Sequence, residues 1–226
     1  MMEMKQEFID LHVHTIHSHG VDTASRMLQE AKKLGTEIGF CDGIKSNAVL
    51  SGIGIRPRNK NEFKRLVKKY RDTFDYIIVH GGSVGINRLA VKDERVDILA
   101  HASINYRDSG INPALAKEAE KNGVAIEINL REIINAKRME RVNAIRRVKM
   151  NLKLKRKYNF DLIVASGAKS RYELRGPRQV YELLKLLGLD QEEIDDATYH
   201  VATRILENNK DRKDKNIIMN GIRVVG

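Results

Sequence analysis

The 226-residue sequence lacks several features that would place it in particular protein classes. Its single cysteine, Cys41, excludes an intramolecular disulfide and suits a reducing compartment. Cys41 follows an apolar run typical of a strand, so we expect a buried, inert thiol. No apolar run approaches the roughly 20 residues that cross a bilayer, and the polar N-terminus does not resemble a signal peptide. We therefore expect a cytoplasmic protein with no membrane partner.

Acidic residues are too few to balance the basic ones. The chain has 41 Lys and Arg against 30 Asp and Glu, which gives a formal net charge of +11. Heat-adapted proteins also carry many charges, but that does not explain so large an imbalance. The excess indicates a polyanionic partner, most often a nucleic acid. Because tryptophan is absent and aromatic residues make up 5%, we do not expect base stacking to be the main mode of binding.

Strand and helix patterns alternate along the whole chain, without a Pro/Gly/Ser linker, an internal repeat or a low-complexity tract. This alternation predicts parallel strands with crossover helices. Six or seven such units favour an α/β fold of the distorted (β/α) TIM-like barrel type, in one domain over residues 1–226 with a short charged C-terminal extension at 208–215. No glycine-rich phosphate loop opens a helix, so a nucleotide cofactor is not indicated. Strands are predicted at 8–13, 37–41, 53–55, 75–79, 96–100, 124–128 and 162–165, and helices at 24–34, 59–71, 87–91, 113–121, 137–158, 178–187 and 191–207.

The first predicted strand ends in two histidines. His12 and His14 are two residues apart on an extended chain, so both side chains point the same way. Two imidazoles on one face can hold a metal ion; in the alternative, one caps the strand and the other is solvated. Ligand-type residues between a strand and a helix are typical of sites in parallel α/β proteins, and Asp10 and Thr15 flank this pair.

Ionisable residues also follow most of the other predicted strands. In a barrel the carboxyl ends of all strands share one face, so we expect these side chains to collect there. A lone histidine after a strand is usually a surface or packing residue, which leaves the role of His80 open. The residues are Asp42, His80, His101, Glu127 and Lys169.

Residues 10–15 resemble the first motif of polymerase-and-histidinol-phosphatase domains, which are metal-dependent phosphoesterases on a distorted barrel. This resemblance makes His12, His14, Asp42 and His101 candidate metal ligands. Other ligand positions are lost, because Gly43, Gly54 and the stretch 167–169 replace a histidine, a glutamate and an Asp-Ala-His motif. A site for two or three metals cannot be built from what is left, so we expect at most a vestigial site for one divalent metal.

A closer resemblance covers nearly the whole chain. Six stretches are similar to the thirty-kilodalton subunit family of ribonuclease P, called protein component 3 in archaea. The resemblance implies a noncatalytic, RNA-binding subunit with no catalytic residues and no cofactor of its own, in an enzyme whose RNA subunit and magnesium remove the 5′ leader of precursor tRNA. It also implies three partners: ribonuclease P RNA, precursor tRNA, and a second small protein subunit with which a heterotetramer could form. The stretches are 81–91, 96–99, 107–111, 125–129, 165–169 and 174–177.

Basic residues in loops after strands are the first candidates for contacts to RNA phosphates. Lys169 is the most informative, because it stands where the phosphatase motif has a metal-binding histidine, and a fixed cation could neutralise charge there. For each arginine a structural ion pair is the alternative, with Asp97 or Asp108 as possible acids. The candidates in loops are Arg88, Arg107, Lys169, Arg171 and Arg175.

The predicted helix at 137–158 offers a second basic surface with little compensating acid beyond Glu140. Like charges three or four residues apart destabilise an isolated helix, which favours a nearby polyanion. The apolar stripe at 139, 142, 145, 148 and 152 is predicted to be core. The RNA-binding candidates here are Arg146, Arg147, Lys149 and Arg156.

Two other functions stay open at this point. One is a phosphoesterase that uses a reduced site of His12, His14, Asp42 and His101 with tightly bound zinc or manganese. The other is an RNA-binding barrel outside ribonuclease P.

Overall fold

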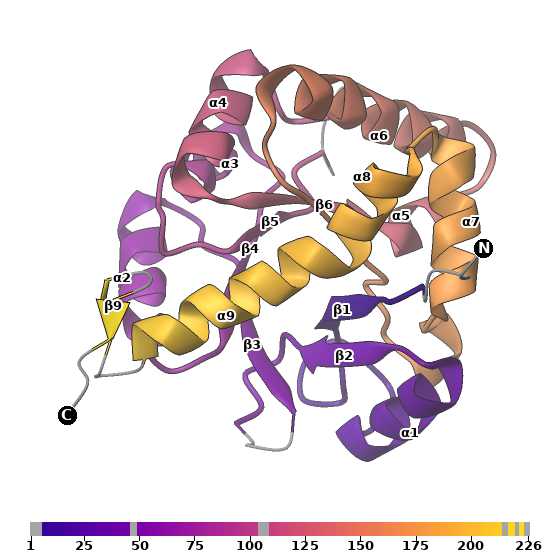
Figure 1. Cartoon of the computed structure of the whole chain (residues 1–226), viewed down its shortest axis with the longest axis horizontal. Helices are drawn as coiled ribbons and strands as arrows, with labels where there is room; N and C mark the ends of the chain where they lie inside the picture. Colours follow the sequence, from indigo (N-terminus) through magenta and orange to yellow (C-terminus); the bar gives the residue numbers. More distant parts are fainter. Residues whose placement is uncertain (1–5, 46–48, 104–108, 214–216, 220–221, 224–226) are drawn as a thin grey trace.

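Seven parallel strands form a nearly closed barrel. The computed structural model describes residues 6–45, 49–103, 109–213, 217–219 and 222–223. The strands lie side by side in chain order, and β7 lies against β1, where the backbone N–H of His14 donates to the carbonyl of Ala168 at 2.9 Å. The predicted distorted barrel is therefore confirmed (Figure 1). Its strands are β1 (Ile9–Val13), β2 (Glu37–Phe40), β3 (Leu50–Ile55), β4 (Tyr76–His80), β5 (Ile98–Ala100), β6 (Ala125–Asn129) and β7 (Leu162–Ala165).

Helices cover the outside of the barrel, and short polar residues start most of them. The Thr23 hydroxyl accepts from the N–H of Arg26 at the start of α1, and Asn59 and Asn112 cap α2 and α4 in the same way. Left-handed Gly35 ends α1. The helices are α1 (Ala24–Leu34), α2 (Lys60–Tyr70), α3 (Val84–Val91), α4 (Pro113–Asn122), α5 (Leu130–Ile134), α6 (Arg138–Tyr158), α7 (Pro177–Leu187), α8 (Gln191–Asp195) and α9 (Val201–Lys213).

Four short elements complete the described part of the chain. A 3-10 turn (Arg171–Glu173) follows β7, and a π-helical turn (Asp196–His200) joins α8 to α9. The strands β8 (Ile217–Met219) and β9 (Ile222–Arg223) form a small antiparallel pair after α9. No helix in the described part of the chain is long and apolar enough to cross a membrane.

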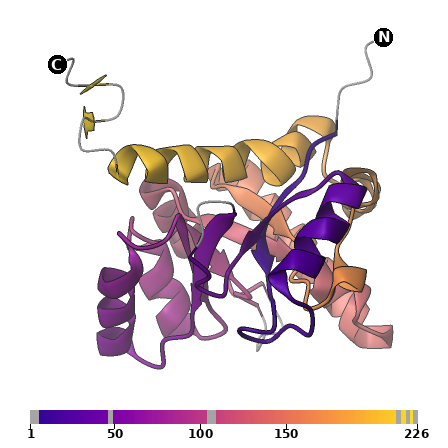
Figure 2. The same ribbon diagram turned by 90° about the horizontal axis from the view of Figure 1, so that it is seen from below.

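Helix α9 closes the end of the barrel where the strands begin (Figure 2). Its Val201, Ala202 and Ile205 pack into an apolar cluster with residues that include Ile9 and Ile98. The carboxyl ends of the strands are at the opposite end, and that end is left for a site.

Small residues make room for one large side chain inside the barrel. Tyr76 of β4 is completely buried, and a Cβ added to Gly52 would lie 2.1 Å from its ring. A Cβ added to Gly39 would lie 2.4 Å from its hydroxyl oxygen. Gly39 and Gly52 are therefore inner positions of β2 and β3. Because Gly52 belongs to β3, this strand begins before the predicted range of 53–55.

Other sequence predictions need correction. Residues 208–213, predicted as the start of a charged extension, continue α9. Helix α5 was not predicted; it follows β6 directly and is capped by Asn129. The stripe on α6 is core only in its second half, because Met139 and Val142 are 66% and 48% exposed whereas Val148 and Leu152 are buried.

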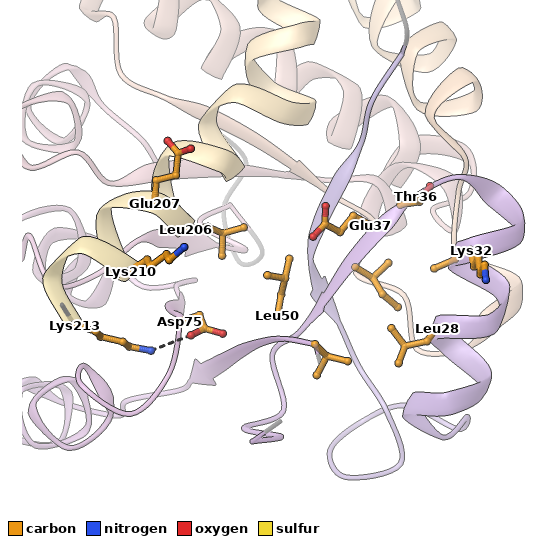
Figure 3. A pocket seen from close by; sticks show the side chains of 13 residues that line it. Leu28, Lys32, Thr36, Glu37, Leu50, Asp75, Leu206, Glu207, Lys210 and Lys213 are labelled. Atoms are coloured by element: carbon orange, nitrogen blue, oxygen red, sulfur yellow. Dashed lines mark hydrogen bonds and ion pairs between the residues drawn. The ribbon is translucent and has the colours of Figure 1, made fainter. Parts of the chain in front are cut away.

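The outer layer of helices has a gap next to β2. Helices follow β1 and each of β3 to β6, but no helix joins β2 to β3 within the described residues. A groove of about 940 Å³ lies in this gap, between α1 and α9 (Figure 3). Leu28, Leu50 and Leu206 form part of its apolar lining, and charged side chains of both signs surround it, including Lys32 and Glu207.

Candidate metal and phosphate site

Three imidazoles meet at the carboxyl end of the barrel. His12 comes from β1, His80 ends β4, and His101 directly follows β5. The ring centroids are 5.1 Å apart for His12 and His80, 5.2 Å for His12 and His101, and 5.1 Å for His80 and His101. The barrel thus brings together three histidines that are 21 to 89 residues apart in the sequence.

Two carboxylates form hydrogen bonds with rings of this cluster. The Nδ1 atom of His12 lies 2.5 Å from Oε1 of Glu127, on β6, and Nδ1 of His101 lies 2.6 Å from Oε1 of Glu132, on α5. His12 and Glu127 are both buried. Burial lowers the pKa of His12, so the neutral ring donates its Nδ1–H to Glu127. Burial alone would raise the pKa of Glu127, but the contact with His12 outweighs it and lowers that pKa to about 2.

The other two histidines of the cluster differ in their environment. Burial, strengthened by the neighbouring His12 and His101, lowers the pKa of His80 far below its usual range. Its Nδ1 atom is buried without a hydrogen-bond partner among the described residues. Burial alone would lower the pKa of His101 as well, but the hydrogen bond to Glu132 raises it. The cluster therefore presents at least two neutral imidazoles, the form that binds metals.

His14 belongs to a separate network. Its Nδ1 atom lies 3.0 Å from Oδ1 of Asp42, and Asp42 also accepts hydrogen bonds from the backbone N–H of Thr15 at 2.5 Å and from the Ser18 hydroxyl. Burial would raise the pKa of Asp42, but these bonds lower it. The structure thus places His12 and His14 close together, with ring centroids 5.0 Å apart, yet gives each its own carboxylate. Asp42 ties β1 to the loop after β2.

Cys41 is buried beside His14, with Sγ 3.3 Å from its Nδ1 atom. Burial raises the pKa of the thiol well above its usual value, and the nearby Asp42 raises it further. A protonated thiol is a poor nucleophile. The expectation of a buried cysteine is confirmed.

A cavity of about 410 Å³ opens above the histidines, and basic side chains outnumber the one acidic side chain of its lining, Glu132. His14, His80 and His101 contribute to its wall, together with Arg56 from the end of β3 and Lys169 from the loop after β7. Neither Arg56 nor Lys169 forms an ion pair with a residue in the ranges that the structure describes. The cavity therefore combines imidazole nitrogens, a ligand type that suits metals, with two cations that have no acidic partner among the described residues.

Of the other RNA-binding residues predicted in loops, those that the structure describes do not line this cavity. Arg88 is exposed on α3, and Arg107 lies outside the described residues. The guanidinium of Arg171 lies 4.8 Å from the ring centroid of Tyr172, and Arg175 donates to the carbonyls of Tyr172 and Leu174. Asp97, proposed as a partner of Arg88 or Arg107, instead binds the buried Arg71 at 2.7 Å.

The four predicted basic residues of α6 have different environments. Arg146 and Lys149 are exposed and have no acidic partner among the described residues. Arg156 forms a two-pronged ion pair with Glu193 of α8, with both N–O distances at 2.7 Å. Arg147 lies 4.0 Å from Glu132, the carboxylate behind His101. Acids on other elements therefore compensate part of α6, which its own sequence could not indicate.

Sequence reasoning missed several residues of the site. His80 and Glu127 were noted at strand ends but received no role, and Glu132 and Arg56 were not noted. Each lies in a strand, at its middle or end, or shortly after one, which was the available signal, but the closed barrel is what brings the four side chains together. Tyr172, which is 76% exposed and lies against the guanidinium of Arg171, was also missed because the composition disfavoured stacking.

Solved structures confirm the fold. A chain of an archaeal ribonuclease P with mature tRNA, determined by cryo-electron microscopy, superposes with a TM-score of 0.81 at 24% identity, covering 96% of this chain and 98% of that one. A prolidase complexed with N-methylphosphonate-L-proline superposes with a TM-score of 0.56 at 11% identity, covering 97% and 78%. These similarities extend over essentially the whole barrel.

Sequence comparison shows the family. Ribonuclease P protein component 3 of Methanosarcina mazei is 33% identical over 98% of this chain and 97% of its own length. The protein of the same name from Methanothermobacter thermautotrophicus is 30% identical over 97% and 96%. The family described as RNase P subunit p30 matches residues 7–214. The chain therefore belongs to the p30 family of ribonuclease P subunits.

Proposed function

We propose that this ribonuclease P subunit is itself noncatalytic and helps the RNA subunit by binding RNA phosphates at the carboxyl end of the barrel. The observation that carries the proposal is that Arg56 and Lys169 both line the cavity and have no acidic partner among the residues that the structure describes. Cations that contact phosphates release counterions, which is the main source of sequence-independent affinity. In this proposal magnesium acts through the RNA subunit, which cleaves precursor tRNA, and not through the protein.

The basic surface would extend from the cavity in two directions. Arg171, with Tyr172 beneath its guanidinium, and Arg175 flank Lys169 in the loop after β7. Arg146 and Lys149 on α6 offer further charges that no acid within the described ranges neutralises. Arg156 contributes less, because Glu193 already neutralises it. The free, buried thiol of Cys41 supports a reducing location, the cytoplasm.

The test is precursor-tRNA cleavage by the reconstituted enzyme at limiting magnesium, with the Lys169→Ala and Arg56→Ala variants. Each change should slow cleavage, and added magnesium should restore the rate, because the lost protein charge can then be replaced. Arg204→Ala is the matched control, since this exposed arginine lies on α9 at the other end of the barrel and pairs with Asp161. Wild-type rates for both Lys169→Ala and Arg56→Ala at limiting magnesium would refute the proposal.

For the second protein subunit, we propose that an amphipathic helix docks in the groove between α1 and α9. The groove lies next to β2, where the described part of the chain contains no crossover helix. The groove has an apolar lining and is surrounded by side chains of both charge signs, which suits a protein helix better than a polyanion. Leu28→Asp should abolish association with the small subunit and leave RNA affinity unchanged, whereas Leu186→Asp, at an exposed position on α7, should affect neither. Unchanged association of the Leu28→Asp variant would refute this docking site.

A further inference from the structure

We propose that His12, His80 and His101 bind a single transition-metal ion, for which zinc is the best fit. Potential ligand nitrogens of these residues all lie within 4.8 Å of one another. Zinc binds imidazole nitrogen at about 2.0–2.1 Å, so the nitrogens of a tetrahedral site are roughly 3.4 Å apart. On binding, the nitrogens would therefore have to approach one another by up to about 1.4 Å. A ligand set of imidazoles without a carboxylate favours zinc over magnesium or calcium.

The hydrogen bonds between the rings and the two glutamates support this assignment independently. Glu127 and Glu132 occupy the Nδ1 atoms of His12 and His101, which leaves Nε2 of each ring for another partner. Metal-binding histidines almost always have such a carboxylate, carbonyl or water on the second nitrogen, which fixes the tautomer and the ring orientation. His12 is 1% exposed, and its Nε2 atom has no hydrogen-bond partner among the described residues. A metal ion would satisfy this buried nitrogen.

A second grouping, His12 with His14 and Cys41, also has potential ligand atoms within 4.8 Å of one another. The existing bonds disfavour it. His14 contacts Asp42 and Ser18 through Nδ1, and the Cys41 thiol lies 3.4 Å from the carbonyl of Val13. The original sequence-based set of His12, His14, Asp42 and His101 has the same difficulty, because Asp42 is engaged with the loop at residues 14–18.

Gly54 leaves the space that the third ligand needs. A Cβ at this position would lie 2.8 Å from Nε2 of His80. The chain thus has a glycine where the phosphatase pattern has a glutamate, and His80 occupies the space. Three protein ligands leave the fourth position of the metal open, and here it faces the cavity that Arg56 and Lys169 also line.

The experiment is metal analysis of the purified full-length chain after loading with zinc and removal of excess ion. We expect one ion per chain in the wild type, and a cobalt-loaded sample should show the visible absorption of a tetrahedral site. His80→Ala should lose the ion, whereas His14→Ala, Cys41→Ser and the distant His200→Ala should keep it. Glu127→Gln, which alters only the group that orients His12, should weaken affinity by roughly 10- to 100-fold.

Because His80 is buried, its variant is checked for folding by circular dichroism without metal. Gly54→Ala is the second test, since it keeps all three imidazoles but crowds His80, and it should also weaken binding. A wild-type chain that retains no zinc or cobalt would overturn the proposal. So would loss of the ion in His14→Ala or Cys41→Ser with retention in both His80→Ala and Gly54→Ala.

Discussion

Two arginines on α6 should have different roles, one in stability and one in RNA binding, and this difference can be measured. Arg156 is 49% exposed but donates two hydrogen bonds to Glu193 and one, at 2.9 Å, to the carbonyl of Gly188. Arg146 is exposed and unpaired within the described part of the chain. Arg156→Ala should therefore lower the stability of the fold, and Arg146→Ala should lower the affinity for RNA.

The expected stability loss for Arg156→Ala follows from its geometry. A partly exposed ion pair contributes up to about 1 kcal/mol, and its two-pronged arrangement places this one at the upper end. In a chain of this size about 1 kcal/mol corresponds to a decrease in Tm of roughly 2–4 °C. Arg146→Ala should change the free energy of unfolding by less than about 0.5 kcal/mol, but should reduce the salt slope of RNA binding by about one unit.

The stability difference between wild type and Arg156→Ala should also depend on pH. The hydrogen bonds from Arg156 lower the pKa of Glu193 below its ordinary value of 4.5. A carboxyl group whose pKa is lowered in the folded state stabilises the fold above its unfolded pKa, and this contribution is lost as pH falls through the folded pKa. The difference in Tm should thus be full at pH 7 and shrink below about pH 4.5. Thermal unfolding from pH 3 to 7 and RNA titrations in increasing salt test this. An Arg156→Ala variant with normal Tm and a reduced salt slope would refute the assignment.

Three further changes test the core. Arg71→Ala should lower the free energy of unfolding, measured in urea, by roughly 3–5 kcal/mol, because it removes the cation that pairs with the buried carboxylate of Asp97. A decrease below about 1 kcal/mol would show that solvent reaches the pair. Tyr76→Phe should stabilise the fold by about 1 kcal/mol, because the buried hydroxyl has no partner among the described residues. Gly52→Ala should destabilise the fold by about 1–3 kcal/mol, because the added methyl group would overpack against the ring of Tyr76. The Cys41 thiol, whose pKa burial raises, should resist iodoacetamide at pH 8 in the native protein and react in denaturant; rapid native labelling would contradict this.

Local sequence signals identified most elements of the barrel. Thr23 with Gly35, and Asn59, mark helix ends by hydrogen bonds and a left-handed turn that involve only nearby residues. Elements whose extent depends on contacts with residues distant in the sequence were predicted less well. Gly52 lies outside the predicted strand at 53–55, although it belongs to β3 and leaves the space that the ring of Tyr76 fills.

The candidate site could be predicted only in part for the same reason. The strand-end rule located His12, His101 and Lys169 at one end of the barrel, but it could not say which side chains converge. His80 joins His12 and His101, whereas His14 turns to Asp42. On α6, neighbouring acids decide which cations remain free, and those acids come from other elements.

The central claim, that this subunit assists an RNA catalyst, is tested most directly by reconstitution. Precursor-tRNA cleavage would be measured at low magnesium with the RNA subunit alone, and then with this protein and the small protein subunit added. The protein alone would be assayed in parallel on precursor tRNA and on a simple phosphate ester. The account predicts a faster rate only in the reconstituted complex, with an inert isolated protein. Turnover by the isolated protein that is lost in a His12→Ala variant would contradict it.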